Sequence, residues 1–416
     1  MTAAAVAPPR DRLGAWCGGW LVAVAVMTPL VAWLAPMGFA LLIALLGLAC
    51  LPALRTTDDD RPAYIALLVG LIWALGSTIW SPYRHPLWGS TALKLVAQAT
   101  LYYAAVCGAR RASPGARTWM LRLLAWGVAL FGLVLLVEGF TGAWIYRTLR
   151  AAVHDPIRPD LGVKNVAQST FVMAVLWPVS ALAAVRAGGG WWLALPMAAG
   201  LGVASRMFGS DAPFLALGLS APVALAVWRW PRMAPRVMAA GAGLFYIAAP
   251  ALVWLVRASG WYDRLQASEQ PSWSQRMRYW RHAADWIGDH PLRGWGLDAS
   301  RMFAPGIQLH PHDAALQIWL ELGLIGAVAA AAFWTVTIVR LGRPARDPAM
   351  AAAAAGVTAY LLFSLVSFGV WQEWWLALGA YSAVLATAVA AQPPPAPRGR
   401  RAPQARRTST AAPVLE

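Results

Sequence analysis

Apolar segments recur along the whole chain, and short polar connections separate them. Most of them run for about 18 to 25 residues, which is long enough for a helix to cross the roughly 30 Å hydrocarbon core of a bilayer. Because lipid does not tolerate unpaired backbone groups, each segment is predicted as a transmembrane helix. The pattern predicts about twelve spans, near residues 13–35, 37–54, 62–80, 90–108, 118–140, 163–185, 191–205, 212–228, 237–257, 312–339, 349–370 and 374–391.

The alternation of spans decides which connections share a side of the membrane. The first span follows Arg10 and Arg12 and lacks a small-residue cleavage site, so we predict an uncleaved anchor with its N-terminus in the cytoplasm. An even number of spans places the C-terminus there too. Every connection assigned to the inside is basic, as the positive-inside rule requires. These connections carry Arg55, Arg61, Arg110, Arg111, Arg117, Arg186, Arg229, Arg232, Arg236, Arg340, Arg343 and Arg346.

The composition agrees with a bilayer as the solvent. Hydrophobic residues make up 59% of the 416 residues and charged residues only 12%, about half the charged share of a soluble domain. The formal net charge of +16 is explained by topology and by attraction to anionic lipid, and no soluble basic domain is present to bind nucleic acid. We therefore expect an all-α polytopic membrane protein. Residues 1–391 form the transmembrane domain, and residues 392–416 form a disordered, basic cytoplasmic tail.

Several kinds of site have no support in the sequence. The chain has no GxxxxGK[ST] phosphate loop and no HExxH zinc motif, which argues against an ATP-driven pump or a zinc protease. Cys17, Cys50 and Cys107 fall near cytoplasmic ends of spans, where a disulfide would not persist. The energy for any reaction must therefore arrive with the substrate.

The outer connections depart from the positive-inside pattern. They are rich in arginine, and both lysines of the chain, Lys94 and Lys164, lie on that side. All six histidines lie there too: His85, His154, His282, His290, His310 and His312. Positive charge on the disfavoured side most often serves an anionic ligand such as a phosphate or pyrophosphate. Pairing with local acids stays open as the alternative, because the loop between Ala258 and Pro311 holds five acids and six arginines.

Arg206 lies in a hairpin between two short apolar segments, Trp192–Ala204 and Ala212–Trp228. Because both are short for a full crossing, the hairpin is predicted to dip below the outer interface. An arginine at the centre of a span costs about 2.5 kcal/mol or more without a partner, and short paired segments point to a binding site. Asp211 is the structural partner that competes with a ligand, and we favour the ligand.

The longest outer loop, residues 258–311, contains a predicted amphipathic helix. Ser272-Trp273-Ser274-Gln275 has the S-x-x-Q pattern of a capping box. One apolar stripe then follows at 100° per residue, made of Trp273, Met277, Trp280, Ala284 and Ile287. Arg276 sits at the edge of this stripe and is predicted to face inward. Arg278 and Arg281 are predicted to point away, toward lipid phosphates.

The tenth span begins with His310-Pro311-His312-Asp313. Pro311 suits the first turn of a helix, so His312 is expected at the helix N-terminus, where the helix dipole lowers the proton affinity of an imidazole. A neutral imidazole accepts a proton, which makes His312 a candidate base or orienting group. Zinc at the two histidines is the rival interpretation, and we do not expect it because no further ligand stands at a suitable spacing.

The residues that follow His312 complete a pattern. Asp313, Gln317 and Glu321 recur every four residues, so they predict a polar stripe that runs about 12 Å into the bundle as a structural network. The run from His312 through Leu316, Glu321 and Gly323 to Gly326 resembles the H-N-x-x-L-x-x-x-x-E-x-G-x-x-G signature of the O-antigen ligase and O-antigen polymerase superfamily, with Asp313 in place of the usual Asn. Further agreeing segments, in order, are Lys164-Asn165, Ser205-Arg206, Ser274-Gln275-Arg276 with Trp280, and Pro291-Leu292-Arg293-Gly294-Trp295-Gly296.

The resemblance implies a glycosyltransferase-C-like enzyme of the bacterial inner membrane with its active site facing the periplasm. Such an enzyme takes a polysaccharide from undecaprenyl pyrophosphate, and for a ligase the acceptor is a sugar of the lipid A core. Arg206 and Arg276 would clamp the pyrophosphate leaving group, and His312 would act on the acceptor hydroxyl. By analogy we expect no metal or other cofactor, inversion at the anomeric carbon, and a lateral opening for two lipid substrates.

Further substrate contacts are expected around these three residues. They are Lys94, Lys164, Arg278, His310 and Asp313. The expected partners are the lipid-linked O-antigen, the lipid A core and membrane lipids, and we expect a monomer or weak oligomer.

Other functions fit part of the same pattern. An O-antigen polymerase uses the same donor, and a protein O-oligosaccharyltransferase is a further alternative, which the lack of a large C-terminal periplasmic domain disfavours. A transporter of lipid-linked glycan or anions is the rival of another class. It predicts polar groups in the cytoplasmic half of several spans. The enzyme is preferred because the predicted buried polar groups gather toward the outer half or the middle: Lys94, Gln98, Glu138, Gln317 and Glu321.

Overall fold

The computed structural model describes residues 11–84, 86, 89–268 and 271–392, and the side chains of residues 265, 266, 268, 271 and 272 are outside this description. Every regular element in these ranges is helical. The α-helices are α1 (Arg12–Leu34), α2 (Phe39–Cys50), α3 (Arg61–Ser77), α4 (Thr91–Arg111), α5 (Pro114–Thr141), α6 (Trp144–Ala152), α7 (Pro159–Arg186), α8 (Ala194–Met207), α9 (Asp211–Arg229), α10 (Met233–Ala258), α11 (Trp261–Ser268), α12 (Pro271–Asp289), α13 (Ala314–Val339), α14 (Pro348–Val366) and α15 (Glu373–Ala390). The 3-10 helices are η1 (Pro36–Gly38), η2 (Leu51–Ala53), η4 (Trp191–Leu193) and η5 (Ala299–Met302).

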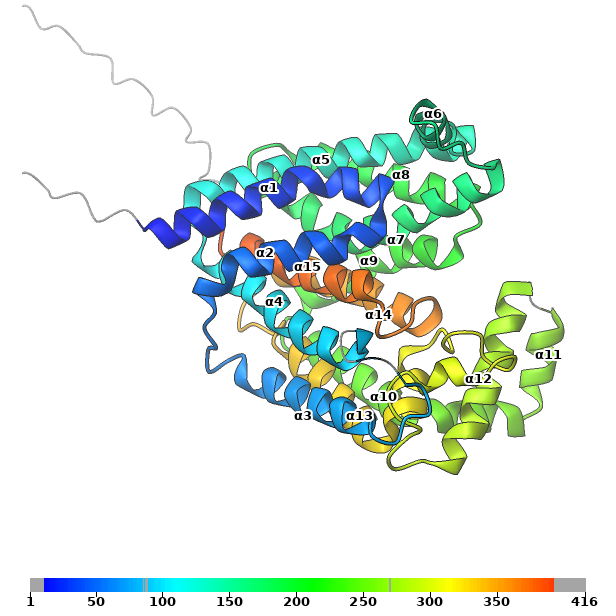
Figure 1. The fold of residues 1–416 in the computed structure, drawn as a ribbon. Coiled ribbons are helices and arrows are strands. Elements are labelled where there is room, and N and C mark those ends of the chain that lie inside the picture. Colours follow the sequence, from blue (N-terminus) through cyan, green and yellow to red (C-terminus); the bar gives the residue numbers. More distant parts are fainter. Residues whose placement is uncertain (1–10, 85, 87–88, 269–270, 393–416) are drawn as a thin grey trace, which may run out of the picture.

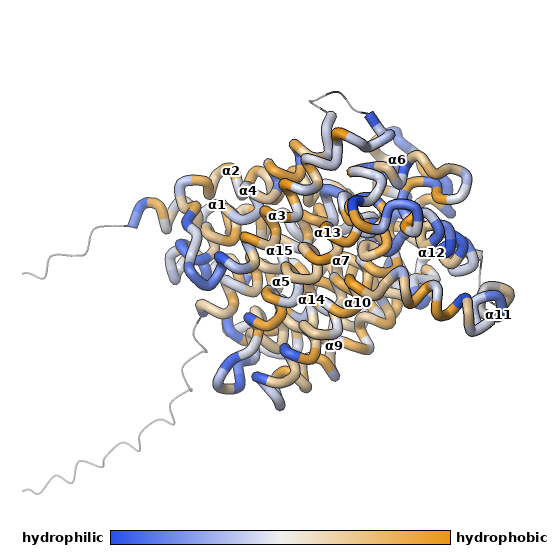
Figure 2. The backbone as a smooth tube through the Cα atoms, turned by 90° about the horizontal axis from the view of Figure 1, so that it is seen from below, coloured by the Kyte–Doolittle hydropathy of each residue, from blue (hydrophilic) through white to orange (hydrophobic). Residues whose placement is uncertain are grey.

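The long helices pack side by side as one bundle (Figure 1). The start of α1 and the end of α15 lie at the same end of it. We call the opposite end, where α4, α7, α13 and α15 begin, the site end. Figure 2 shows hydrophobic residues along the length of the bundle and hydrophilic segments toward its ends, with α6, α11 and α12 at the site end.

All twelve predicted apolar segments are helical in the structure. Within the described ranges, ten helices are long and apolar enough to cross a membrane, which makes this a multi-pass membrane protein. The other two segments are shorter, because α3 has 17 residues and α8 has 14. Twelve crossings therefore remain a prediction. Of the predicted disordered tail, residues 392–416, only Gln392 is described, and it donates from Nε2 to Thr118 Oγ1 at 3.1 Å. The remainder of the tail and His85 lie outside the described residues.

Close contact between α5 and α8 holds the hairpin that carries Arg206. A Cβ added at Gly200 would lie 1.9 Å from the carbonyl oxygen of Gly132, and one at Gly132 would lie 2.3 Å from the carbonyl oxygen of Pro196. Small residues let two helix backbones approach in lipid, where van der Waals contact drives association. The two glycines therefore fix where α8 runs against α5.

Two short helices were not predicted from the apolar pattern, α6 and α11. The buried carboxylate of Glu138 holds the start of α6, accepting hydrogen bonds from the backbone N–H of Ile145 at 3.1 Å and of Tyr146 at 2.8 Å. A carboxylate is stabilised at a helix N-terminus by these free donors. Glu138 also accepts from Trp33 Nε1 at 3.0 Å, so this buried acid has a structural role.

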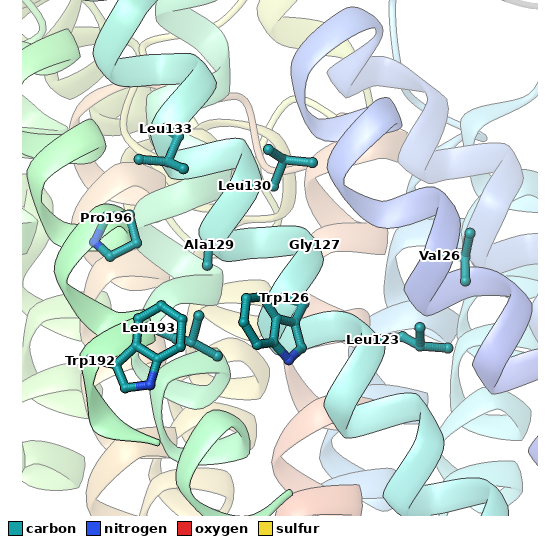
Figure 3. A pocket seen from close by; sticks show the side chains of 10 residues that line it. All are labelled: Val26, Leu123, Trp126, Gly127, Ala129, Leu130, Leu133, Trp192, Leu193 and Pro196. Carbon is teal, nitrogen blue, oxygen red and sulfur yellow. The ribbon is translucent and has the colours of Figure 1, made fainter. Parts of the chain in front are cut away.

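An apolar groove of about 450 Å³ opens between α1, α5 and α8 (Figure 3). Trp126 and Trp192 line it and pack edge to face, with ring centroids 5.2 Å apart. Every lining residue is apolar, and none is a predicted site residue. The groove offers no charged group for chemistry.

Candidate active site

The predicted site residues come from different helices but share the site end of the bundle. Lys94 lies in the first turn of α4, and Lys164 lies in the second turn of α7. Arg206 lies in the last turn of α8, and Arg276 lies in α12. His312 precedes α13. The alternating direction of the helices brings all of these positions to one end (Figure 1).

His312 does not lie in the first turn of α13, and that prediction is wrong. The helix begins at Ala314 because Asp313 is its N-cap, whose Oδ1 accepts a hydrogen bond from the Leu316 N–H at 2.9 Å. Aspartate is among the preferred N-cap residues. His312 stands one residue outside this cap with a φ of 57°, a left-handed conformation that costs a non-glycine residue about 1–3 kcal/mol and recurs at active sites.

One hydrogen bond sets the tautomer of His312. Its Nδ1 lies 2.7 Å from the carbonyl oxygen of Ser367. Because a carbonyl only accepts, Nδ1 carries the proton and Nε2 keeps its lone pair. The ring of Tyr279 lies nearly parallel to the imidazole, at 12° and 6.1 Å. Within the described part of the chain Nε2 has no hydrogen-bond partner, so it is available to accept a proton.

The lowered proton affinity predicted for His312 is confirmed, but from a different cause. Burial lowers the pKa of His312 most strongly, and the positive charge of Arg276 lowers it further. The bond to the Ser367 backbone acts in the opposite direction. Both lowering causes depend on tertiary packing, whereas the expectation relied on the dipole of α13. The imidazole is held neutral beside a guanidinium.

His310 packs against His312, with ring centroids 4.3 Å apart. Its Nδ1 accepts the backbone N–H of His312 at 3.2 Å, and its Nε2 lies 3.3 Å from Nε2 of Gln372. Burial, followed by the electrostatic effects of His312 and Arg301, lowers the pKa of His310 to about 3. His310 is therefore a neutral, buried ring that holds the backbone of His312. Its predicted contact with substrate stays a prediction.

The amphipathic helix predicted in the long loop is present as α12. Its buried side chains are Met277, Tyr279, Ala283, Ala284 and Ile287. Trp273 and Trp280, which belong to the predicted stripe, are half-buried. The capping box stays untested, because the Ser272 side chain lies outside the description. The tyrosine that stacks on His312 belongs to this buried face, so α12 forms one wall of the site.

Arg276 faces inward, as its position on the helical wheel predicted. Its guanidinium lies over the ring of Trp273, 5.1 Å from the centroid. Its Nε is buried and has no hydrogen-bond partner within the described part of the chain. Burial lowers the pKa of Arg276, because charge is costly away from water. Arg278 and Arg281 are exposed, as predicted.

Arg206 contacts residues of its own hairpin. Its Nη1 lies 4.0 Å from Asp211 Oδ1, and its guanidinium lies 5.4 Å from the ring centroid of Phe214. The arginine side chain is 63% exposed. The structure thus shows the acid that competes with a ligand. Among the described contacts, none joins Arg206 to His312.

The two lysines differ in their surroundings. Lys94 Nζ forms an ion pair with Glu373 Oε1 at 2.9 Å, and both side chains are about half exposed. Lys164 is exposed, and the neighbouring Asn165 donates from Nδ2 to the Tyr146 hydroxyl at 3.3 Å. Glu373 had not been identified from the sequence as a partner, because it lies far from Lys94 along the chain.

The polar stripe along α13 forms the predicted structural network. Gln317 donates from Nε2 to Glu321 Oε1 at 3.0 Å, and its own Oε1 accepts the Val370 N–H at 2.9 Å. Glu321 is completely buried and also accepts from Trp371 Nε1 at 2.6 Å. These bonds tie the α14–α15 connection, which carries Ser367, to α13.

The segment Pro291–Gly296, which follows α12, contacts the part of α13 around Gly323. The α13 helix is kinked at Gly323, where φ is 64° and ψ is −161°. The kink leaves two carbonyl groups of α13 without their usual helical hydrogen bonds. Residues of the loop between α12 and α13 donate hydrogen bonds to them instead. Trp295 donates its N–H to Leu320 O at 2.9 Å, and Gly296 donates to Glu321 O at 2.7 Å. The motif that follows α12 is thus fastened to the motif that follows His312, which sets the distance between α12 and the histidine.

Comparison with known proteins finds a family match in the middle part of the chain. A family model described as O-Antigen ligase matches residues 196–331. These residues contain Arg206, Arg276 and His312, together with the kink of α13. This part of the chain is therefore similar to the O-antigen ligase family. Lys94, Lys164 and Glu373 lie outside the matched residues.

Individual relatives cover a similar part of the chain. A protein of Rickettsia conorii described as a candidate polysaccharide ligase is 28% identical over 130 residues, which make up 28% of this chain and 32% of that protein. A protein of Rickettsia bellii with the same description is 27% identical over 151 residues, or 33% of this chain and 36% of its own length. The chain spans about a third of the length of these relatives.

An apolar cavity of about 150 Å³ lies next to the start of α13, among α3, α10, α13, α14 and α15. Ala314, the first residue of α13, lines it together with Tyr246, Tyr360 and Trp371. Ser367, Tyr279 and Gln372 complete the surroundings of the histidine pair, and no motif in the sequence had identified them. The start of α13 therefore has the histidine pair on one side and an apolar cavity on the other.

Proposed function

We propose that this protein is an O-antigen ligase that transfers polysaccharide from undecaprenyl pyrophosphate to a sugar of the lipid A core, on the periplasmic face of the bacterial inner membrane. The observation that carries the proposal is the half-buried guanidinium of Arg276, whose buried Nε has no hydrogen-bond partner among the described residues. It lies beside His312, whose Nε2 has no partner in the same part of the chain. A partly buried cation that forms no ion pair with any described carboxylate fits an anionic ligand. The family match of the same residues agrees with this role.

In this mechanism His312 Nε2 takes the proton of the acceptor hydroxyl as its oxygen attacks the anomeric carbon. The bond from that carbon to the pyrophosphate oxygen breaks, and the leaving group departs with the electron pair. The imidazolium is stabilised by the Ser367 carbonyl, to which Nδ1 donates. Inversion at the anomeric carbon follows from such a single displacement.

Arg276 stabilises the negative charge that grows on the leaving pyrophosphate. Its guanidinium stays charged and offers a fork of donors that matches phosphate oxygens. A bound pyrophosphate also cancels the charge that lowers the pKa of His312. The donor substrate therefore makes the histidine a stronger base at the moment when one is needed.

Arg206 is proposed as the second arm of the clamp. Its present partner, Asp211, is 4.0 Å away, and both side chains are at least half exposed. Exposed ion pairs of this kind contribute about 0–1 kcal/mol, so a pyrophosphate can replace the carboxylate. The apolar cavity below Ala314 suits part of an isoprenoid or acyl chain.

The test is transfer by purified protein supplied with undecaprenyl-pyrophosphate glycan and lipid A core, without nucleotide and with a chelator present. A ligase glycosylates the lipid A core. Growth of the glycan on the donor alone would instead indicate a polymerase. Movement of the donor across vesicle membranes without transfer would indicate a transporter. Either of the last two results contradicts the proposal.

A further inference from the structure

A polar face of α4 points at the start of α15. Lys94, Gln98 and Tyr102 stand four residues apart and so share one side of the helix. Lys94 pairs with the Glu373 carboxylate at 2.9 Å, and the Tyr102 hydroxyl donates to the Glu373 carbonyl at 3.4 Å. Gln98 lies between these two contacts. Its side chain therefore also faces the first turn of α15.

Gln98 has an unused acceptor in this position. Its Oε1 is buried and has no hydrogen-bond partner among the described residues. A buried amide oxygen without a partner costs about 1–3 kcal/mol, and polar groups inside membrane spans mark functional sites by default. The Lys94–Glu373 pair beside it has no net charge. The position therefore fits a neutral ligand with hydroxyl donors, and not a phosphate.

Gln372 adds a second unpaired amide end, next to the histidines. His310 Nδ1 accepts a hydrogen bond, so the neutral ring carries its proton on Nε2. The Nε2–H group of His310 needs an acceptor, which is the amide oxygen of Gln372. The oxygen and the nitrogen of a glutamine amide have nearly the same shape, so their positions can be exchanged. In either orientation one end of the amide contacts His310 and the other end is buried and unpaired within the described chain.

The two flanks of His312 have different chemistry. On one side of His312, α12 contributes the positive charge of Arg276 and the aromatic ring of Tyr279. The α14–α15 connection approaches it through Ser367 and, by way of His310, through Gln372. The first flank suits a leaving pyrophosphate. The second offers uncharged amides, which bind sugar hydroxyls because each hydroxyl both donates and accepts.

We propose that Gln98 and Gln372, bordered by the Lys94–Glu373 ion pair, form the subsite that binds the acceptor sugar. This subsite rests on the proposed function and adds the place from which the attacking hydroxyl reaches His312 Nε2. Lys94 then acts within a neutral sugar-binding surface, and phosphate contact is left to the arginines. All four residues lie outside the part of the chain matched by the ligase family.

The test is the KM for lipid A core in a Gln98→Met variant, which keeps the side-chain length and removes both polar ends. Loss of one hydrogen bond raises the acceptor KM roughly fivefold to tenfold, while the KM for the lipid-pyrophosphate donor stays within about twofold. Gln98→Glu keeps an acceptor oxygen at this position, so its KM for lipid A core is expected to lie within about threefold of the wild-type value. Thr100→Val, on the exposed side of α4, is the matched control and leaves both constants unchanged.

The elution volume and thermal midpoint of each variant show whether it is folded. An unchanged acceptor KM in folded Gln98→Met protein would overturn the subsite and leave the proposed function standing. A rise in the donor KM of the same size would place Gln98 at the donor sugar and also overturn it. If the wild-type protein transfers nothing to lipid A core, the proposed function fails, and the subsite fails with it.

Discussion

His312 combines three properties that a base in this site needs. Its tautomer is set by Ser367, its ring is kept neutral by burial, and its backbone is held by His310. Together they leave the Nε2 lone pair without a hydrogen-bond partner among the described residues, beside the Arg276 guanidinium.

The pH dependence of transfer follows from the neutral imidazole. Because the pKa of His312 is lowered from 6.5, the ring stays neutral at pH 6.5, and activity is lost only as the pH falls through the lower value. We expect the acidic limb of kcat/KM, which reports the free enzyme, below pH 6.5. In Arg276→Gln this limb moves to higher pH, since one charge that lowers the pKa is removed. A wild-type limb at or above pH 6.5 would contradict the assignment.

Arg276→Gln is expected to lower kcat by about 10²–10³, the usual effect of losing one donor to transition-state charge. Arg276→Lys recovers part of the loss, because charge returns without the fork of donors. Arg278→Gln, two residues along and exposed, is the matched control and changes kcat by less than about threefold. Initial rates at saturating donor and acceptor measure both effects. Equal losses in Arg276→Gln and Arg278→Gln would show that the inward orientation of Arg276 has no role.

At the scale of elements, the kink of α13 and the outer loop form one unit. Gly294 and Gly323 meet at this junction with φ angles of 69° and 64°. A Cβ at Gly294 would lie 2.4 Å from the carbonyl carbon of Glu321. Only glycine fits both the backbone angle and the space. The junction positions α12, and thereby Arg276, against His312.

Gly294→Ala is therefore expected to destabilise the folded protein by about 3 kcal/mol or more, through strain and overpacking together. Gly218→Ala in α9 is the control, because nothing lies within 4 Å of its added Cβ, and alanine is favoured there by about 0.5–1 kcal/mol. Thermal midpoints in detergent measure both changes. A Gly294→Ala protein as stable as the wild type would mean that the junction does not hold the loop.

The sequence predicted those elements whose signal is local. Apolar runs located all twelve long segments, and the helical wheel placed Arg276 and Arg278 on the correct faces of α12. The short helices α6 and α11 lack a long apolar run, so hydropathy did not reveal them. The predicted start of α13 is too early, because the cap of this helix is Asp313 and Pro311 lies outside it. Ser367 and Glu373 were missed because their contacts span many residues of chain, which no local pattern encodes.

At the scale of the whole molecule, the site depends on the topology. Every predicted site residue lies at one end of the bundle because consecutive long helices run in opposite directions (Figure 1). The predicted crossing with the least support is α8, whose 14 residues reach about 21 Å as a helix at 1.5 Å per residue. Close packing on α5 through Gly132 and Gly200 shields α8 with protein, and it stabilises this short helix within the bundle.

Labelling with a membrane-impermeant maleimide tests this crossing. Trp191→Cys precedes α8 and Ser210→Cys follows it. If α8 crosses, the reagent labels Ser210→Cys from the periplasmic side and Trp191→Cys only after the inner membrane is opened. The wild-type protein is the control, and its three cysteines are buried. Labelling of both positions from the same side would show that α8 does not cross and that the count of twelve is wrong.

The role of His312 as a base is tested by the rate of glycan transfer to lipid A core in His312→Ala, compared with His282→Ala. His282 lies on α12 and stacks on Trp286, with ring centroids 5.5 Å apart, so it controls for the loss of an imidazole near the site. A positioned base contributes about 10²–10⁴ to the rate. We predict a loss of at least 100-fold in His312→Ala and less than about threefold in His282→Ala. Glycan transfer at the wild-type rate by folded His312→Ala protein would show that His312 is not the base.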